Sequence, residues 1–428
     1  MINSTLKPTT AQQWLAYIEA LHPKAIAMGL DRVSAVAKNC HIKPSFPIIT
    51  VAGTNGKGST CAMLSQIYTE AGYKVGCYTS PHLLRYNERV RINQQDISDN
   101  DLCAAFEAVE NARKDIALTY FEMGTLAAMW HFCQSNVDVV VLEVGLGGRL
   151  DAVNIFEPAC TIVTTIDLDH MEFLGDTREK IGFEKAGIFR PAILAICGDD
   201  NPPTSLINHA EQIKAPLKLI NRDFSVKKLA HGWQYSQGEE NYLLPNLGLQ
   251  GEFQLNNAAC VVCAAQHMQS VLPVTTHQIY TALQAVTLIG RFYAIQSNPS
   301  IIVDVAHNPH AALSLAHNLK TTACTGKTLA VFAMLADKDI DGVIQALSAH
   351  INQWFIADNH SARGAKAQNL QDKLMQHNSK ALTVLFADVA SALVAACKVA
   401  TKNDRIIVFG SFYTVADAIA HVSSKNIE

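Results

Sequence analysis

Residues 49–64 read ITVAGTNGKGSTCAML, and this stretch decides how the rest of the chain is interpreted. An apolar, β-branched run leads into a glycine-rich turn, and a helix-like run follows, which is the layout of a phosphate-binding loop. The usual loop has the spacing G-x-x-x-x-G-K-[ST]. Here only two residues separate Gly53 from Gly56 and Lys57, and Gly58 precedes Ser59. The loop is therefore shorter than usual, although its lysine, its glycines and its hydroxyl groups are all present.

Length and composition describe an ordinary globular chain. Its 428 residues are enough for two or three domains, and 49% of them are apolar while 17% are charged. The net charge of −4 argues against a general nucleic-acid binder. No apolar run approaches the roughly 18 residues of a membrane span, and the first residues lack a signal core. We therefore expect a cytoplasmic protein with neither a membrane nor a nucleic-acid partner.

Eleven cysteines, an odd number, are scattered through apolar stretches. In a cytoplasmic chain this usage indicates buried thiols rather than disulfides. Cys260 and Cys263 have C-x-x-C spacing, but they lie in an alanine-rich, helix-like run without a partner pair. We interpret both as core residues.

Strand-like runs without polar alternation recur along the first two thirds of the chain, and a helix-like run follows each. Parallel strands that are covered on both faces have this composition, so the pattern predicts an α/β fold with a parallel sheet. Residues 218–226 and 232–237 differ, because their runs are shorter and richer in Gly and Asn, and they are candidates for antiparallel strands. The predicted parallel strands lie in 46–52, 74–80, 137–145, 160–168 and 192–197.

Residues 291–300, RFYAIQSNPS, contain Pro and Ser and are expected to form a linker. Strand-like runs then resume at 300–306, 328–334, 353–358, 383–388 and 405–411. The chain is thus expected to hold a P-loop, parallel-sheet ATPase domain in 1–294, followed by a smaller Rossmann-like α/β domain in 299–428.

The glycine-rich turn has the chemistry of a nucleotide site. Its backbone N–H groups and the helix N-terminus favour anions, and Lys57 adds a full positive charge. Ser59 and Thr60 offer hydroxyls to a phosphate or a magnesium ion. Glu143 ends the buried run VVVLE, at the sheet edge where ligands of open α/β sheets gather. It is the candidate metal carboxylate.

Two further stretches allow more than one interpretation. GLGGRL at 145–150 is close to the dinucleotide pattern G-x-G-x-x-G but lacks its third glycine, so that reading is weak. TTIDLDH ends another strand with Asp167, Asp169 and His170. Magnesium prefers oxygen ligands, so ligand chemistry alone favours an aspartate there. Lys185, directly after Glu184, has the pattern of a surface ion pair.

Seven motifs in this order resemble the folylpolyglutamate synthase family, which is related to the Mur peptidoglycan ligases. The resemblance extends over nearly the whole chain and is closest to the bifunctional bacterial members, the dihydrofolate synthase/folylpolyglutamate synthases. DVAHNPHA has the form found in the folate enzymes rather than in the Mur enzymes. The motifs are AGTNGKGST (52–60), YTSPHLLRYNERVRIN (78–93), LTYFEMGT (118–125), LEVGLGGRLDAVN (142–154), DLDHMEFLG (167–175), EKAGIFR (184–190) and DVAHNPHA (304–311).

The resemblance implies a Mur ligase-like fold and an ATP-dependent carbon–nitrogen ligase. Such an enzyme adds L-glutamate to 7,8-dihydropteroate and to the γ-carboxyl of reduced folates, through an acyl phosphate. It implies ATP and two Mg²⁺ ions, allows for a monovalent cation, and implies a monomer. A folylpolyglutamate synthase without dihydropteroate activity, a Mur-type ligase and a nucleotide-hydrolysing switch are the alternatives.

The resemblance also assigns residues. It implies that Lys185 is carbamylated and binds metal, and it overrules the preference for an aspartate over His170. The metal ligands are then Ser80, Glu143, His170 and Lys185. The nucleotide residues are Thr54, Asn55, Gly56, Lys57, Gly58, Ser59, Asn257, Arg291 and Asp304. The catalytic residues are Lys57, Lys185, Asp304 and His307.

The acceptor site that the resemblance implies is formed by three segments. Ala27 departs from the pattern of the bifunctional members, which have an acidic residue there. RYNERVRI at 85–92 fits a folate-facing loop, and it fits an ordinary half-exposed strand as well. The acceptor residues are Ala27, Met28, Gly29, Leu30, Thr119, Tyr120, Phe121, Glu122, Leu150, Asp151 and Ala152.

Overall fold

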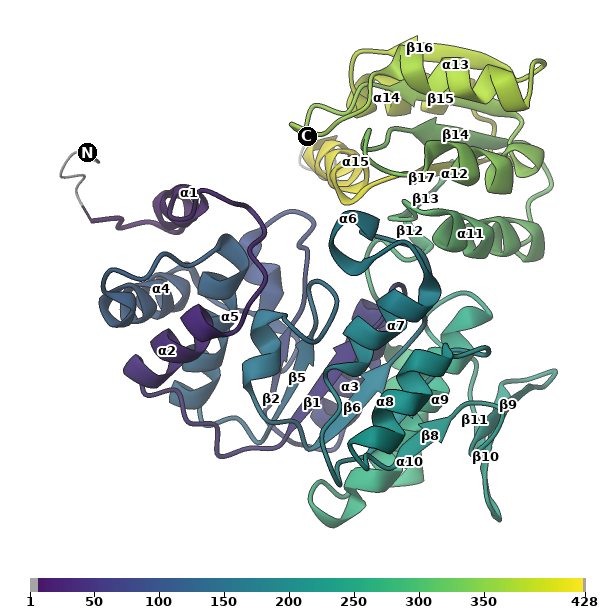
Figure 1. Cartoon of the computed structure of the whole chain (residues 1–428). Coiled ribbons are helices and arrows are strands. Elements are labelled where there is room, and N and C mark those ends of the chain that lie inside the picture. The colour runs from purple at the N-terminus through teal and green to yellow at the C-terminus, as the bar shows by residue number, and fades with distance from the viewer. Residues whose placement is uncertain (1–6, 426–428) are drawn as a thin grey trace. The chain divides into compact units, whose positions relative to one another are not determined.

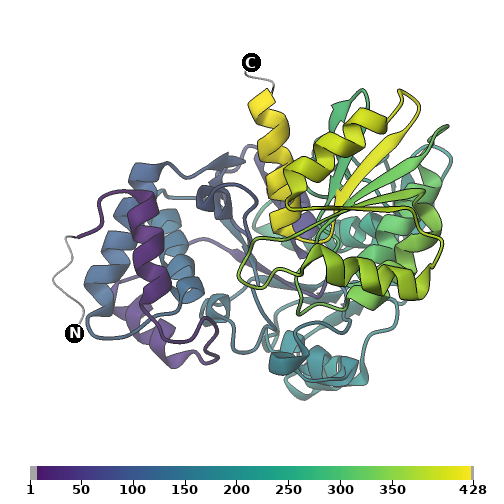
Figure 2. The ribbon, with the colours of Figure 1, turned by 90° about the horizontal axis from the view of Figure 1, so that it is seen from above.

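The computed structural model describes residues 7–425, which fall into two compact units. One unit runs up to Leu247 and includes Leu255–Val286, and the other holds Gly248–Gln254 and the chain from Thr287 on. Figure 1 labels the elements of both units, and Figure 2 shows the ribbon from above. The domain borders expected at residues 294 and 299 stay a prediction.

The first unit is built on an eight-stranded sheet in the order β4-β3-β2-β5-β1-β6-β7-β8. Neighbouring strands are parallel from β2 to β8, and β3 and β4 form an antiparallel edge. β1 and β5 are buried at every position, which explains why their sequences lack polar alternation. The strands are β1 Ile48–Ala52, β2 Val75–Tyr78, β3 Val90–Ile92, β4 Gln95–Asp96, β5 Val139–Glu143, β6 Cys160–Val163, β7 Ala195–Cys197 and β8 Leu217–Leu219.

Helices cover both faces of this sheet. Val140 and Leu142 face a core to which α1 Ala11–Ala20, α2 Asp31–Asn39, α4 Asp99–Arg113, α5 Tyr120–Gln134, α7 Arg178–Ala186 and α8 Thr204–Gln212 contribute. The buried residues of α3 Lys57–Glu70 lie outside that core, and α10 Thr276–Ala285 packs against α3. The remaining helical elements are α9 Phe253–His267 and the short η1 Tyr86–Arg89, η2 Ala152–Ile155, α6 Met171–Leu174 and η3 Met268–Ser270.

A separate antiparallel sheet consists of β9 Ser225–Lys228, β10 Trp233–Gln237 and β11 Glu240–Leu244. The sequence prediction of antiparallel strands was right for β9 and β10. It was wrong for the first part of 218–226, because β8 pairs parallel to β7 at the edge of the large sheet. Helix α8 provides the crossover that makes this parallel pairing possible.

The second unit holds a six-stranded sheet in the order β12-β13-β17-β14-β15-β16, parallel except for β12. The expected linker at 291–300 instead forms β12 and its turn into β13, and the Pro and Ser of that stretch lie in this hairpin. The strands are β12 Tyr293–Ser297, β13 Ser300–Asp304, β14 Thr328–Phe332, β15 Gln353–Ala357, β16 Thr383–Phe386 and β17 Arg405–Phe409, and the helices are α11 Pro309–Thr321, α12 Ile340–Leu347, η4 Ser348–His350, α13 Ala367–His377, α14 Val389–Val399 and α15 Phe412–Lys425.

Two expectations about the chain as a whole can be compared with this fold. All eleven cysteines have free thiols, and Cys260 and Cys263 are fully buried core residues, as predicted. Between residues 7 and 425, no helix has both the length and the apolar character needed to cross a bilayer.

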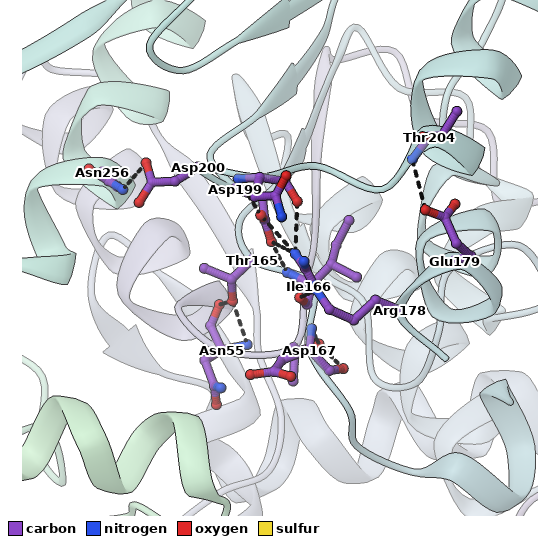
Figure 3. A network of polar contacts seen from close by, with 12 residues as sticks. Asn55, Thr165, Ile166, Asp167, Arg178, Glu179, Asp199, Asp200, Thr204 and Asn256 are labelled. Atoms are coloured by element: carbon purple, nitrogen blue, oxygen red, sulfur yellow. Dashed lines mark hydrogen bonds and ion pairs between the residues drawn. The ribbon is translucent and has the colours of Figure 1, made fainter. Parts of the chain in front are cut away.

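Beyond β6 the chain leaves the sheet as residues 164–170, which we call the strap. An ion pair fixes its middle (Figure 3). The backbone N–H of Ile166 donates to Asp199 Oδ2 at 2.6 Å, and the Ile166 carbonyl accepts from Arg178 Nε at 2.8 Å. Arg178 Nη2 also lies 2.9 and 3.1 Å from the two oxygens of Asp199. Arg178 of α7 and Asp199 after β7 therefore hold the strap from both sides.

We predict that Asp199→Ala lowers the free energy of unfolding by about 2–3 kcal/mol, because it removes the counter-ion of Arg178 and leaves the Ile166 N–H without its acceptor. This is less than for a fully buried pair, since the Arg178 side chain is 35% exposed. The control is Asp200→Ala, which removes the neighbouring exposed carboxylate and its contacts with Asn221 and Asn256. It should cost about 0.5 kcal/mol or less. Urea unfolding of both variants measures the difference, and equal losses would contradict the strap's dependence on Asp199.

Candidate active site

The glycine-rich loop lies between buried β1 and the first residue of α3, Lys57. It is fastened to the strap by two threonine hydroxyls. Thr164 Oγ1 and Thr165 Oγ1 donate to the Asn55 carbonyl at 2.6 and 3.1 Å, and the Thr54 N–H donates to the Thr165 carbonyl at 2.7 Å. The loop is thus held by the neighbouring strand β6 as well as by its own.

Two glycines of the loop have no room for a side chain. A Cβ on Gly53 would lie 1.9 Å from Thr164 Oγ1. Gly56 has a φ of +88°, and a Cβ there would lie 2.6 Å from Asn257 Oδ1. Asn257 of α9, predicted from the sequence as a nucleotide residue, therefore packs directly against the loop.

Lys57 bends back over the loop that precedes it. Its Nζ donates to the carbonyls of Gly53 and Thr54 at 3.0 and 3.3 Å. Gly58 and the buried Ser59 follow in the first turn of α3, and the positive end of the helix dipole at this N-terminus favours an anion. The lysine, the loop amides and the helix N-terminus together form a cradle for phosphate groups.

Glu143 ends β5 and is 4% exposed. Ser80 follows the adjacent strand β2, and its N–H donates to Glu143 Oε2 at 3.1 Å. The structure therefore brings together two of the predicted metal ligands. A hydroxyl and a carboxylate are hard oxygen donors, so this donor set fits Mg²⁺.

His170 lies at the end of the strap in a left-handed conformation with a φ of +50°. Its side chain is 39% exposed, and its Nε2 is 4.0 Å from Asp169 Oδ2. Over residues 7–425, no group of three or more His, Cys, Asp or Glu side chains could hold a metal ion. The place of His170 in a metal site therefore stays a prediction.

Lys185 is buried in the last turn of α7, with 3% exposure. Burial lowers its pKa to about 7, and the charge of Lys57 acts in the same direction, against Asp169 and Asp151. The surface ion pair suggested by the sequence pattern is thus wrong, because Glu184 pairs with Arg149 at 2.8 Å instead. A buried amine with this lowered pKa is neutral in a substantial fraction of molecules at neutral pH, and the neutral amine is the form that reacts with carbon dioxide.

The GLGG turn packs against the backbone at the end of α7, where Lys185 lies. A Cβ on Gly148 would lie 2.7 Å from the Glu184 carbonyl and 2.9 Å from the Lys185 carbonyl. The next residue, Arg149, donates its N–H to the Glu184 carbonyl at 2.8 Å. The glycines of this motif therefore serve close packing against the end of α7.

Two of the predicted acceptor segments are joined by an arginine that sequence reasoning missed. Thr119 caps α5, and the capping box includes the buried Glu122. Arg32 Nη2 lies 2.9 Å from Glu122 Oε1 and 2.7 Å from the Ala27 carbonyl. Arg32 thereby ties the half-buried loop 27–30 to α5, a link between positions 90 apart in sequence that no local pattern reveals.

The third acceptor segment joins the same region. The ring of Phe121 packs over Gly145, where a Cβ would lie 2.6 Å from its Cζ, and its centroid is 5.9 Å from that of Tyr78. Asp151 caps η2 and accepts from the Leu146 N–H at 2.8 Å. Burial raises the pKa of Asp151 to about 7, although backbone N–H groups act against the shift. Leu150 is half-buried, Ala152 is buried, and the Tyr120 ring lies 5.7 Å from that of Tyr86.

In the second unit, Asp304 ends β13. Its two oxygens accept from the backbone N–H groups of Phe292 and Ala306 at 2.9 and 2.8 Å. Burial raises its pKa to about 6, and the nearby Arg291 acts against this shift. Asp304 and Arg291, both assigned to the nucleotide by the resemblance, are therefore near each other.

His307 belongs to the same group of side chains. Its Nδ1 lies 2.8 Å from the Val305 carbonyl, and its ring centroid is 6.3 Å from that of Phe412. The Arg291 guanidinium lies 6.0 Å from the centroid of the same phenyl ring. Two predicted residues of the second unit, Arg291 and His307, thus lie beside Phe412, which the sequence did not single out.

Family models and individual relatives agree about this chain. Residues 51–265 match the Mur ligase middle domain, and residues 290–412 match the Mur ligase glutamate ligase domain. The dihydrofolate synthase/folylpolyglutamate synthase of Escherichia coli is 43% identical over 416 residues, or 96% of this chain and 95% of the relative. The Haemophilus influenzae protein of the same name is 41% identical over 437 residues, or 97% and 99%.

Solved structures extend the likeness to the fold. Escherichia coli FolC in complex with DHPP and ADP has a TM-score of 0.94 and 41% identity, over 99% of this chain and 100% of that one. A bifunctional folylpolyglutamate synthase/dihydrofolate synthase with Mn, AMPPNP and L-glutamate bound has a TM-score of 0.89 and 41% identity, over 98% and 100%. With two α/β units, a shortened phosphate-binding loop and relatives that match from end to end, the chain belongs to the dihydrofolate synthase/folylpolyglutamate synthase family of Mur-type ligases.

Proposed function

We infer that this chain is an ATP-dependent amide ligase. It adds L-glutamate to 7,8-dihydropteroate, which gives dihydrofolate, and to the γ-carboxyl of reduced folates, which lengthens their glutamate chains. The observation that carries this inference is the phosphate cradle of Lys57 beside the buried Glu143, in a chain that matches its relatives over nearly its whole length. The ligands of the solved relatives, ADP, AMPPNP, Mn, L-glutamate and DHPP, belong to the classes that this reaction uses.

The reaction overcomes the poor reactivity of a carboxylate, whose oxygen is a bad leaving group. Transfer of the γ-phosphoryl group of ATP to the acceptor carboxylate gives an acyl phosphate and ADP. The neutral α-amine of L-glutamate then attacks the acyl carbon, phosphate leaves, and the amide forms. The attacking amine must lose a proton, so the reaction needs a base.

We assign the nucleotide to the loop of residues 54–59. Its N–H groups bind phosphate oxygens, and Lys57 stabilises the charge of the phosphoryl group in transfer. Asn257 is assigned to the nucleotide because it packs against Gly56. Arg291 and Asp304 are assigned from the second unit by the family resemblance. Each of these roles is a proposal.

We propose two Mg²⁺ ions for the metal site. Bound magnesium would neutralise phosphate charge and polarise the phosphoryl group. Glu143 and Ser80 supply oxygen donors from adjacent strands, and a carbamate on Lys185 would add a third. The proposed ligands are Ser80, Glu143, His170 and carbamylated Lys185.

We propose that the acceptor lies against the loop of residues 27–30, the start of α5 and the segment 150–152. Arg32 and Phe121 support this proposal, since their contacts join the three segments into one region. Asp304 and His307 are two candidates for the base. Burial raises the pKa of the Asp304 carboxyl to about 6, which brings it closer to neutral pH, and the imidazole of His307 carries a ring nitrogen that can accept a proton.

Some expectations from the sequence stay predictions. They are a monomeric state, a cytoplasmic location, the absence of nucleic-acid and membrane partners, and a monovalent cation site. A folylpolyglutamate synthase without the first activity would fail to use dihydropteroate. A nucleotide-hydrolysing switch would release ADP without glutamate.

The function is tested by ADP release with one substrate omitted at a time. We expect release only when ATP, magnesium, L-glutamate and an acceptor are all present, and we expect both dihydropteroate and a reduced folate to serve as acceptor. Lys57→Ala should lower kcat with both acceptors by about 10²–10³-fold, because a contact to a transferring phosphoryl group is lost. ADP release that is independent of glutamate would sink the ligase assignment.

A second prediction concerns Gly56. An alanine there must adopt a left-handed conformation and displace the amide of Asn257, so we expect affinity for ADP to fall more than tenfold. Gly72→Ala is the matched control, because Gly72 has a φ of +90° but nothing within 4 Å of its would-be Cβ. It pays the same strain, about 1–2 kcal/mol, away from the loop. Calorimetric titration with ADP decides, and equal affinities in the two variants would contradict a nucleotide role for this loop.

A third prediction concerns Lys185. In the presence of magnesium and ¹³C-bicarbonate, the wild type should show a carbamate carbon signal, because burial lowers the pKa of the amine and so raises its neutral fraction near pH 7. Lys185→Ala should lose the signal and on the order of 10²-fold in kcat, with partial rescue by acetate. Lys180→Ala removes an exposed lysine of the same helix, one paired with Asp176, and should change neither property. A plain amine at Lys185 in the wild type would refute the carbamate.

A further inference from the structure

Arg89 lies where two parts of the proposed active site meet. β2 and β3 pair antiparallel with Tyr78 opposite Val90, and the Thr79 N–H donates to the Arg89 carbonyl at 2.9 Å. This pairing holds Arg89 beside the segment that leads from β2 to the proposed metal ligand Ser80. The stretch 85–92, for which the sequence allowed a loop or a strand, is a turn of η1 followed by β3.

The half-buried guanidinium of Arg89 lies over two tyrosine rings. Its Cζ is 5.2 Å from the centroid of Tyr86 and 5.6 Å from that of Tyr120, and its Nε donates to His82 Nδ1 at 2.9 Å. Among residues 7–425, its side chain has no carboxylate partner and no further hydrogen bond. The terminal nitrogens Nη1 and Nη2 therefore keep their N–H groups for another acceptor.

The other charged side chains around this hairpin are already engaged. Arg85 pairs with Asp99 at 2.8 Å, and Arg91 pairs with Asp96 at 3.4 Å. The carboxylate of Glu88, next to Arg89 in sequence, accepts from three successive backbone N–H groups at 2.7, 2.8 and 2.8 Å. Arg89 is thus the arginine of this hairpin whose charge stays without a counter-ion in the described part of the chain.

A half-buried cation without a counter-ion is unfavourable unless a ligand supplies one. The guanidinium is a planar fork whose parallel N–H groups match the two oxygens of a carboxylate, and stacking on aromatic rings fixes the plane of the fork. The chemistry of Arg89 therefore points to a carboxylate ligand.

The two acceptors differ by one such carboxylate. Dihydropteroate has a single carboxyl group, which becomes the acyl phosphate. A folate ends in glutamate, whose γ-carboxyl is activated while its α-carboxylate stays ionised throughout the reaction. Tyr120, under the Arg89 guanidinium, belongs to the proposed acceptor segment that starts at Thr119.

We propose that Arg89 binds the α-carboxylate of the folate acceptor, and so serves folate extension but not the use of dihydropteroate. This subsite rests on the proposed function, since it requires that one enzyme takes both acceptors. It makes Arg89 a residue that distinguishes the two activities.

The test compares three variants with the wild type in both reactions. Arg89→Ala removes the cation, Arg89→Lys keeps the charge but loses the fork, and Arg85→Ala is the control on the same hairpin. A lost charge-assisted contact should reduce kcat/KM for a reduced folate by about 10- to 100-fold in Arg89→Ala. Arg89→Lys should recover part of this loss. The dihydropteroate reaction should change by less than about threefold in all variants, which also shows that they are folded.

A folate analogue sharpens the test. When 4-aminobutyrate replaces the glutamate of the folate, the γ-carboxyl remains for activation but the α-carboxylate is missing. Wild-type enzyme should use this analogue about as poorly as Arg89→Ala uses the normal folate. Arg89→Ala should suffer no further loss with the analogue, because a double-mutant cycle isolates the contact between the two groups.

Other results would overturn the proposal. An increased KM for L-glutamate in both reactions would assign Arg89 to the incoming amino acid. Equal losses of kcat with both acceptors would assign it to the phosphoryl group or to the packing of the tyrosines. If the wild type itself fails to extend a folate, the proposed function fails, and the Arg89 variants are then not the cause.

Discussion

The fastening of the phosphate-binding loop to the strap is the constraint on which the rest of the site depends. A loop with only two residues between Gly53 and Gly56 has little backbone of its own to shape a phosphate cradle. The hydroxyls of Thr164 and Thr165 supply this support, because both donate hydrogen bonds to the Asn55 carbonyl. Since Gly53 touches Thr164, a side chain at that glycine would separate the loop from the strand that holds it.

The strap is in turn held by residues that lie further along the chain. Arg178 and Asp199 both form hydrogen bonds with the backbone of Ile166. The hydroxyl of Thr54 accepts from the Asp167 N–H at 3.0 Å and donates to the Asp167 carbonyl at 3.1 Å. A path of short contacts therefore runs from the ion pair through the strap to the loop. A substitution at the ion pair acts on the phosphate cradle through this path, although neither charged residue belongs to the cradle.

The sequence predicted what is local and missed what is brought together by topology. Fully buried parallel strands and the turn before Lys57 follow from residue types and spacing, so the α/β fold and the phosphate loop were within reach. β8 and β12 were misjudged because the partner of a short strand is chosen by the sheet, not by the strand's own sequence.

The site residues also divide into those that a local sequence pattern predicts and those whose contacts depend on the topology. Arg32, Arg89 and Arg178 have ordinary local patterns, and their importance lies in partners such as Glu122 that are distant in sequence. The GLGG turn packs against the backbone of Glu184 and Lys185, whereas local reasoning could only compare it with a dinucleotide motif. Where another segment packs closely against the backbone, the sequence shows a glycine. The glycine alone does not identify the segment that packs there.

Two buried ionisable side chains near Lys57 have shifted pKa values. Burial lowers the pKa of Lys185 to about 7, and the charge of Lys57 acts in the same direction, while burial raises the pKa of Asp151 to about 7. Each buried group is thus driven toward its neutral form, which is the usual response to a costly buried charge.

The GLGG turn joins the two halves of the proposed chemistry. Gly145 lies against Phe121 of the acceptor region, whereas Gly148 lies against the end of α7 that buries Lys185. Asp151 closes the turn by accepting the Leu146 N–H, so the backbone between the two contacts has little freedom. On the proposed acceptor site, this turn is the short segment that lies between the acceptor region and the end of α7.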